Sequence, residues 1–272
     1  MIENLVHTNH NGDILDFVKS GIFVNMNDLR DFAWSIDAAN NSINGFYKEV
    51  ASKTIPVVIK KNVNLIDNVI DHFESDVHDK KPGFFVVNGY EFYCYCTSIK
   101  YSDYDNDKFI VAELGITSDN PVWIKKHKIS FYSTSVPDGT SYIKRYAYHY
   151  PYRYRANVGV KNLFNPLPYS SHFELIIYGP VENPSITING HIYQIFTDIG
   201  DNERIVINYS SNANKTVFKY LSNGDMVNVF NCRNKEVSVF KKISPGNQLV
   251  SWSGLFSFDI VLDEERSSPK WV

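Results

Sequence analysis

The chain has 272 residues, of which 43% are hydrophobic and 21% charged, so it can bury a sizeable core and is not expected to be disordered. Its formal net charge of −3 and its pI near 6.2 argue against a surface whose main task is to bind nucleic-acid phosphates. Aromatic residues reach 15%, with 18 Tyr and 18 Phe, which favours β structure first and contacts between subunits second.

The N-terminal stretch MIENLVHTNHNGD has no basic start followed by an apolar run, so we expect no secretory signal. No run of about 18 apolar residues predicts a membrane span, so we expect no membrane insertion. The chain is therefore expected to be synthesised in a cytoplasm.

One stretch has the spacing of an amphipathic helix. Its apolar residues recur on a single face, and they are Leu65, Ile66, Val69, Ile70, Phe73 and Val77. Asn64 is a possible N-cap, and Lys80-Lys81-Pro82-Gly83 ends the pattern. The sequence predicts one helix over about residues 64–77, with its apolar face packed on a sheet.

Asn-Gly pairs occur five times, and both residues tolerate the positive φ that a type I′ hairpin turn needs. Three pairs lie between alternating apolar and polar runs that predict strands: Asn88-Gly89, Asn189-Gly190 and Asn223-Gly224. The other two pairs are Asn11-Gly12 and Asn44-Gly45. Beyond residue 170 the pattern predicts roughly seven or eight short strands, which is typical of a β-sandwich.

The segment from Pro137 to Asn165 has a different character, with Tyr alternating through Tyr146–Tyr154 and Pro151 among them. This pattern predicts an extended connection between two domains. We therefore expect an N-terminal β domain, a barrel or sheet with one helix, over residues 1–150. A β-sandwich domain follows over residues 151–272, so the fold is mainly β.

No signature of catalysis or cofactor binding is present. G-x-S-x-G, H-E-x-x-H, the Walker loop and G-x-G-x-x-G are all missing, so the sequence assigns no catalytic and no cofactor-binding residue. The sequence does not exclude a carboxylate pair for glycoside hydrolysis, because such a pair is set by the folded geometry. The candidates are Glu49, Glu113, Glu174 and Glu182, and nothing in the sequence singles out any of them.

No metal site is expected either. Asp103, Asp105 and Asp107 match the start of a calcium loop, but Lys108 and Leu114 stand where Gly and Glu are required, which favours a polar hairpin tip. Cys94, Cys96 and Cys232 are expected to be buried free thiols. The eight histidines are expected at surfaces or interfaces, with His7 and His10 in a flexible segment.

The aromatic belt in the connection is the candidate interface. It comprises Tyr142, Tyr146, Tyr148, Tyr150, Tyr152, Arg153, Tyr154 and Arg155. Tyr and Arg are the residues that dominate protein–protein interfaces, so a subunit or inter-domain contact is favoured. Stacking on carbohydrate or on nucleic-acid bases remains an alternative.

The sequence resembles the distal tail proteins of long-tailed phages that infect Gram-positive hosts. The C-terminal segments that carry the resemblance are 177–180, 183–190, 203–208, 231–234, 240–246, 256–260 and 265–271. More loosely similar N-terminal segments are 29–34, 56–59 and 118–123, so the resemblance covers nearly the whole chain.

The resemblance implies a structural, non-enzymatic protein of the virion, at the phage tail tip or baseplate. Members of the family form a ring, commonly a hexamer, whose N-terminal domains surround a channel and whose C-terminal domains are galectin-like sandwiches. The implied partners are further copies of the chain, the tail tube protein, a tail-tip protein and a receptor-binding protein, with DNA only in transit. Binding of host cell-surface glycans is the alternative function. Besides the belt, the edges of the N-terminal domain that would face the ring are expected to be functional surface.

Overall fold

A computed structural model describes residues 4–25, 27–103, 108–134, 159–212 and 214–271 of the chain. These residues form two compact units: unit 1 consists of residues 1–125 and 264–272, and unit 2 of residues 126–263. The chain passes from one unit to the other at 125/126 and again at 263/264. The domain boundary predicted between residues 150 and 151 lies outside the described residues.

Unit 1 is built around an antiparallel sheet. Its elements are β1 (Val6–Thr8), β2 (Ile14–Asp16), β3 (Ile22–Val24), α1 (Asn27–Arg30), β4 (Ser35–Ala39), β5 (Ser42–Tyr47), β6 (Ala51–Lys60), α2 (Val63–Asp79), β7 (Gly83–Val87), β8 (Tyr90–Asp103), β9 (Phe109–Ser118) and the start of β10 (Trp123–Phe131). The long strand β8 joins two runs of strands, β2-β1-β7-β8-β10 and β8-β9-β6-β3. β4 and β5 form a separate two-stranded hairpin.

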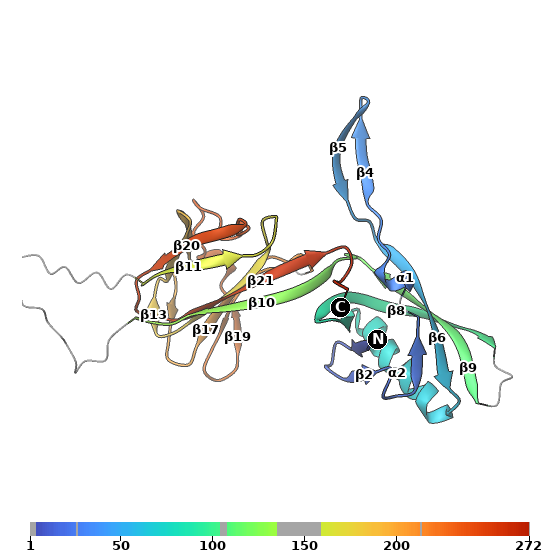
Figure 1. Cartoon of the computed structure of the whole chain (residues 1–272). Helices are drawn as coiled ribbons and strands as arrows, with labels where there is room; N and C mark the ends of the chain where they lie inside the picture. Colours follow the sequence, from blue (N-terminus) through green and yellow to red (C-terminus); the bar gives the residue numbers. More distant parts are fainter. Residues whose placement is uncertain (1–3, 26, 104–107, 135–158, 213, 272) are drawn as a thin grey trace, which may run out of the picture. The chain divides into compact units, whose positions relative to one another are not determined.

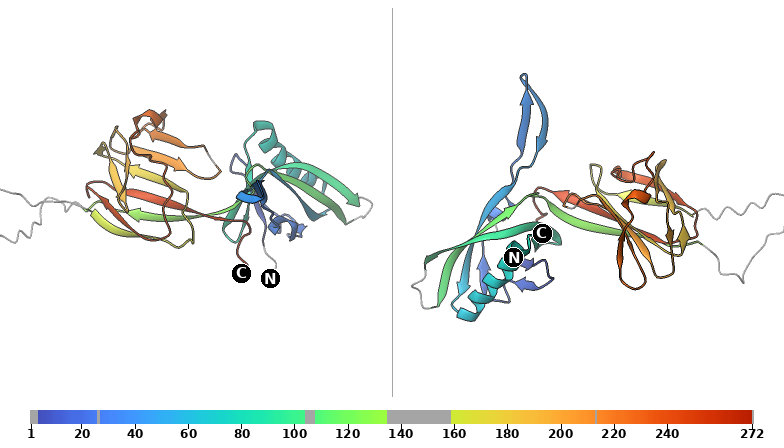
Figure 2. Two further views of the ribbon diagram at one scale, coloured as in Figure 1. Left: turned by 90° about the horizontal axis from the view of Figure 1, so that it is seen from above. Right: turned by 180° about the vertical axis from the view of Figure 1, so that it is seen from behind.

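Helix α2 confirms the helix predicted over residues 64–77. Val69 and Phe73 are buried in the core of unit 1 together with Ile55, Val57 and Ile59 of β6. In Figures 1 and 2 the helix lies along one face of the sheet. The N-cap is Asn62 and not Asn64, and Lys80 ends the helix in the left-handed conformation (φ 54°). The four-residue helix α1 is too short to produce an apolar periodicity, which is why the sequence did not indicate it.

The expected surface position of the histidines is wrong for His7. Its side chain is fully buried in β1, between β2 and β7, and packs on Phe73 and Phe85. His7 Nδ1 lies 2.8 Å from His72 Nε2, and His7 Nε2 lies 3.9 Å from Asp76 Oδ2. Nearby, Asp76 accepts hydrogen bonds from two groups of His10, its backbone N–H (2.7 Å) and its ring Nδ1 (2.8 Å). The partners come from α2, some 65 residues away, so no local pattern reveals the burial.

This arrangement makes the stability of unit 1 depend on pH. Burial lowers the pKa of His7 from 6.5 to about 3, and burial also lowers the pKa of His72. Between pH 6.5 and pH 3 the unfolded chain therefore binds a proton that folded His7 does not, and the free energy of unfolding falls as the pH falls. We expect His7 to account for a loss of about 3 kcal/mol between pH 7 and pH 4.

Denaturant unfolding of the protein and of His7→Gln at both pH values measures this contribution. The variant lacks the titrating ring, so its stability should decline less steeply with acid, whatever its stability at pH 7. Equal declines in the two proteins would show that His7 does not remain neutral in the folded state.

The Asn-Gly pairs at residues 88–89 and 189–190 make the predicted hairpin turns. Both residues of each pair have positive φ, and the pairs join β7 to β8 and β14 (Ser185–Ile188) to β15 (His191–Gln194). Asn223-Gly224 also joins two strands, but only Gly224 has positive φ, and Leu221 N–H bonds to the carbonyl of Asp225 across a longer loop. Asn44-Gly45 lies inside β5, where the pairing with β4 is irregular.

Unit 2 has two larger sheets and a separate two-stranded sheet, formed by β13 (Val181–Glu182) and β16 (Asp198–Ile199). Its elements are the rest of β10, β11 (Gly159–Asn165), β12 (Phe173–Tyr178), β13 (Val181–Glu182), β14 (Ser185–Ile188), β15 (His191–Gln194), β16 (Asp198–Ile199), β17 (Arg204–Tyr209), β18 (Thr216–Tyr220), β19 (Met226–Asn228), the 3₁₀ turn η1 (Phe230–Cys232), β20 (Gly246–Trp252) and most of β21 (Phe258–Arg266). One sheet has the order β19-β18-β17-β12-β21-β10 and the other the order β11-β20-β14-β15.

The inward side chains of both larger sheets form one core, as in a β-sandwich. Leu175, Ile207 and Phe258 come from the first sheet, and Val250 and Trp252 from the second; all are buried. The prediction of a mainly β fold is confirmed. No helix in the described part of the chain is long and apolar enough to cross a bilayer.

Candidate interaction surfaces

The hairpin β4–β5, hereafter the arm (residues 35–47), stands out from the rest of unit 1 (Figures 1 and 2). Asn40 and Asn41 both have positive φ and form its tight turn. In the described residues β4 and β5 pair only with each other. Neither strand therefore gains a neighbour from the body of unit 1.

The two faces of the arm differ in character. Ile36 pairs with Phe46, and Ala38 pairs with Ile43, so these four side chains share one face. Ser35, Asp37, Ala39, Ser42 and the partly exposed Tyr47 lie on the other face. Ile36, Ile43 and Phe46 remain 55%, 58% and 61% exposed. A two-stranded hairpin is marginal alone, so this open apolar face is a candidate contact surface.

The root of the arm is anchored to the body of unit 1. Lys53 of β6 donates to the backbone carbonyls of Leu29 (2.8 Å) and Asp31, which lie in the segment before β4. Lys48 follows β5 and donates to the carbonyl of Pro121 at 2.9 Å. Burial, aided by the nearby Lys53, lowers the pKa of Lys48 to about 8, and burial also lowers the pKa of Lys53. These bonds fix where the arm leaves the body.

A cleft of about 540 Å³ lies beside this root. Asp28, Asp31, Lys48, Glu49 and Lys53 give it charges of both signs, and Phe32 and Val50 expose large apolar surfaces there. The mixture suits contact with a polypeptide better than it suits a single charged ligand.

The predicted interface residues Tyr142, Tyr146, Tyr148, Tyr150, Tyr152, Arg153, Tyr154 and Arg155 lie outside the described residues. Their role as an interface stays a prediction. The arm, by contrast, was not singled out from the sequence. Ile36 and Ala38 alternate with other residues before Asn40-Asn41, whereas Ile43 and Phe46 after it are three residues apart. An alternation in the sequence does not say whether the apolar side is covered.

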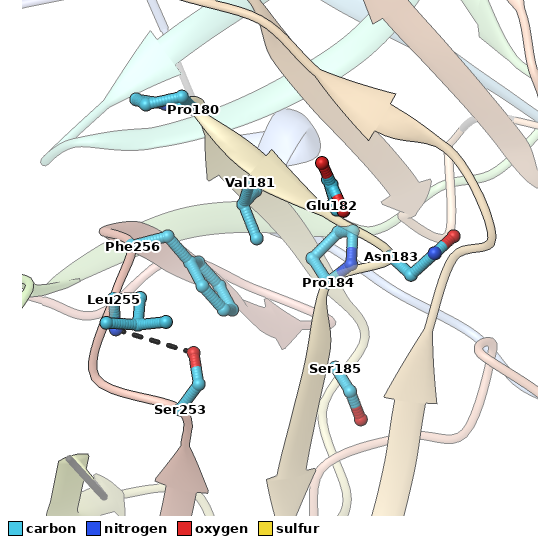
Figure 3. A pocket seen from close by; sticks show the side chains of 9 residues that line it. All are labelled: Pro180, Val181, Glu182, Asn183, Pro184, Ser185, Ser253, Leu255 and Phe256. Carbon is cyan, nitrogen blue, oxygen red and sulfur yellow. Dashed lines mark hydrogen bonds between the residues drawn. The ribbon is translucent and has the colours of Figure 1, made fainter.

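Unit 2 has a pocket of about 400 Å³ beside β13 and the loop that precedes β21 (Figure 3). Val181, Leu255 and Phe256 supply apolar walls, and Glu182 supplies a carboxylate. The backbone N–H of Leu255 donates to Ser253 Oγ (3.4 Å), which shapes this loop. The lining offers apolar contact and no nucleophile paired with a base.

Tyr178, Arg204 and Tyr220 form a row on the outer side of β12, β17 and β18. The guanidinium of Arg204 lies 4.7 Å from the ring centre of Tyr220. The hydroxyl of Tyr178 donates to Asp259 (2.6 Å), which also pairs with Lys128 (2.8 Å). These groups satisfy one another, so the row is explained by stabilisation of the sheet.

The four candidate carboxylates lie on separate elements. Glu49 is beside the arm root, Glu113 on β9, Glu174 on β12 and Glu182 on β13. Within the described ranges, no three His, Cys, Asp or Glu side chains are grouped so that they could hold a metal ion. Of the calcium-like loop, Asp105 and Asp107 lie outside those ranges, whereas Leu114, where the pattern requires Glu, is buried in β9.

The cysteines differ in exposure. Cys94 and Cys96 are buried as predicted, whereas Cys232 is partly exposed. Burial raises the pKa of Cys96 to about 12 and raises the pKa of Cys94 as well.

Because the thiolate is the reactive form, we expect a maleimide at neutral pH to add once per folded chain, at Cys232. Intact-mass analysis should show one adduct before unfolding and three after it; three in the native protein would contradict this burial.

Solved structures of phage proteins have the same fold. The Dit protein of phage SPP1, described as a paradigm of the hub adsorption apparatus in phages infecting Gram-positive bacteria, matches with a TM-score of 0.58 and 7% identity, over 96% of this chain and 99% of that one. A chain of the phage P2 baseplate, in its activated conformation with Ca, matches with a TM-score of 0.62 and 12% identity, over 98% and 99%. The same baseplate with Sr gives a TM-score of 0.61 at 12% identity, again over 98% and 99%.

No protein-family profile and no curated protein sequence matches the chain. The likeness is therefore one of fold, and it includes both units. The resemblance to distal tail proteins that the sequence indicates is confirmed at the level of the fold.

Proposed function

We propose that the chain is a structural component of a phage tail tip or baseplate, an adaptor that joins the tail tube to the host-adsorption apparatus. The likeness to hub and baseplate chains over 96–98% of this chain carries the proposal. A shared sandwich alone is a common architecture, but here unit 1 and unit 2 both have counterparts in one protein.

The proposed adaptor is a closed ring of identical copies, with six as the expected number. A ring needs a heterologous contact, in which one surface of a copy meets a different surface of the next. The arm supports this part of the proposal because it exposes an apolar face outside the body of unit 1. The other proposed partners are a tail tube protein, a tail-tip protein and a receptor-binding protein, with DNA passing through the ring. The proposed role includes no catalysis.

Particles of the phage that encodes this chain test the proposal. Mass spectrometry of purified virions should detect the chain, and gold-labelled antibody against it should mark the end of the tail distal to the capsid. A chain present in infected cells but missing from purified particles, or located at the capsid, would exclude the proposed role.

A further inference from the structure

The chain returns to unit 1 at Glu264, and we name the segment that follows the strap (residues 264–271). Glu264 is buried and accepts a hydrogen bond from the hydroxyl of Tyr90 on β8 (2.9 Å), and it also pairs with Lys270 (2.8 Å). Asn88, in the turn before β8, donates to the backbone carbonyl of Lys270 at 3.0 Å. These bonds fix the path of the strap along unit 1.

The end of the strap lies against Arg30, the last residue of α1. The guanidinium of Arg30 donates to the backbone carbonyl of Pro269 (2.9 Å) and lies 3.9 Å from the ring centre of Trp271. Arg30 is only 6% exposed, and a buried cation is stabilised by a hydrogen-bond acceptor and by the face of an aromatic ring. Trp271 is 74% exposed, so its ring covers the guanidinium without belonging to the core.

Helix α1 depends on contacts of this kind. It has four residues, and a helix of one turn is not stable without tertiary packing. Part of its support comes from β6, because Leu29 is buried in the core and Lys53 donates to the carbonyls of Leu29 and Asp31. The strap supplies a second attachment, at Arg30.

The arm begins a few residues after this attachment. Residues 31–34 connect Arg30 to β4, and Phe32 and Trp34 among them are 58% and 50% exposed. This short connection is therefore not held by burial in the core. The direction in which β4 leaves the body depends on where α1 ends, whereas the other root of the arm, at Lys48, has its own bond.

We propose that the strap sets the direction of the arm, and that Arg30 is the positioning residue through which it acts. The inference concerns the arm of a single copy and does not rest on the proposed ring. The strap continues β21, which begins in unit 2, so one strand leads from unit 2 to the contact that holds the root of the arm.

The spread of distances between the arm and the body of unit 1 tests this inference. Spin labels on Ser42→Cys, in the arm, and Lys100→Cys, in β8, report these distances by pulsed electron paramagnetic resonance. The chain also carries Cys232→Ser, because the thiol of Cys232 is partly exposed. Phe46→Asp is included so that no apolar contact with a second copy holds the arm, and labelled chains are diluted with unlabelled ones.

Removal of residues 268–272 should broaden the distance distribution by about twofold or more. Trp271→Ala removes only the ring beside Arg30 and should broaden the distribution less, whereas Trp271→Phe keeps a ring there and should leave it nearly unchanged. Hydrogen exchange in β6 and β8 should stay the same in both Trp271 variants, which separates a change in the arm from a weaker core. The matched control is Lys19→Ala, which removes an exposed ion pair with Asp16 elsewhere in unit 1 and should not change the distribution.

An unchanged distribution after removal of residues 268–272 would overturn the inference and assign the direction of the arm to the bonds of Lys48 and Lys53 alone. If the shortened chain does not fold, the Trp271 variants decide. Trp271→Ala with the unchanged distribution, or Trp271→Phe as broad as Trp271→Ala, would overturn the role of the ring beside Arg30. None of these results bears on the proposed ring, because each is measured within one copy.

Discussion

Phe46→Asp is expected to prevent assembly at concentrations where the unchanged chain forms rings. The side chain is 61% exposed and lies on the apolar face of the arm, so its loss removes little from the fold of unit 1. In the assembled ring, however, the new carboxylate would be buried against apolar side chains. Such a residue typically changes a contact by 2 kcal/mol or more, about 30-fold in affinity, and a ring repeats the contact at every interface.

Ser42→Asp is the matched control for this effect. Ser42 lies four residues away on the same hairpin, but its side chain points to the other face. Light scattering over a range of concentrations should give a monomer for Phe46→Asp and a ring for Ser42→Asp, with equal thermal stability of the two monomers. Assembly of Phe46→Asp at the normal concentration would exclude the arm as the ring contact.

Gly179→Ala is expected to be the most damaging small substitution in unit 2. A Cβ added at residue 179 would lie 2.1 Å from the carbonyl oxygen of Gly200 and 2.8 Å from that of Ile199. Both are backbone atoms, so the two loops must separate, and this also disturbs the 3.1 Å hydrogen bond from Gly179 N–H to the carbonyl of Glu203. We expect a loss of about 3 kcal/mol, or a fall in Tm of roughly 10 °C.

Gly45→Ala is the control, because a Cβ there meets no atom within 4 Å. Scanning calorimetry should separate the two variants clearly, with Gly45→Ala within about 0.5 kcal/mol of the unchanged protein. If Gly179→Ala melts at the normal temperature, the two loops are not packed as closely as described.

Much of the fold follows from local rules. Asn88-Gly89 and Asn189-Gly190 make two-residue turns because Asn and Gly accept positive φ, and the strands on each side alternate as half-buried strands do. The periodic apolar residues from Leu65 to Phe73 are sufficient to place a helix on a sheet, whereas Val77 of the same pattern is 44% exposed. Burial of Cys94 and Cys96 agrees with their two-residue spacing, which puts both thiols on one side of β8.

The candidate site was harder to predict, because it depends on what is left uncovered. The alternation of Ile36 and Ala38 predicts a strand with one apolar face, but the same pattern arises when that face is buried in a core. Ile43 and Phe46 are three residues apart and share that face only because the pairing shifts between Asp37 and Ala38. His7 shows the opposite case, since its partners His72 and Asp76 come from a distant helix. In both cases the exposure or burial of the side chain is set by tertiary contacts that one sequence does not reveal.

The surface that the sequence favoured was the aromatic belt, because Tyr and Arg dominate interfaces by composition. That argument identifies the residue types suited to a contact but not the segments that expose them. The arm is not rich in aromatic residues, since it contains only Phe46 and Tyr47. It nevertheless exposes three large apolar side chains on one face. Among the described residues, exposure makes the arm the candidate surface, and the belt stays a prediction.

The mass and shape of the purified chain in solution test the proposed adaptor most directly. Native mass spectrometry combined with negative-stain electron microscopy should show a closed ring whose mass is close to six times 31.3 kDa. A closed ring with a different number of copies would correct the expected stoichiometry but would still agree with the proposed ring. A monodisperse monomer at every concentration, together with virions whose tail tips contain no ring of this chain, would contradict the proposed role.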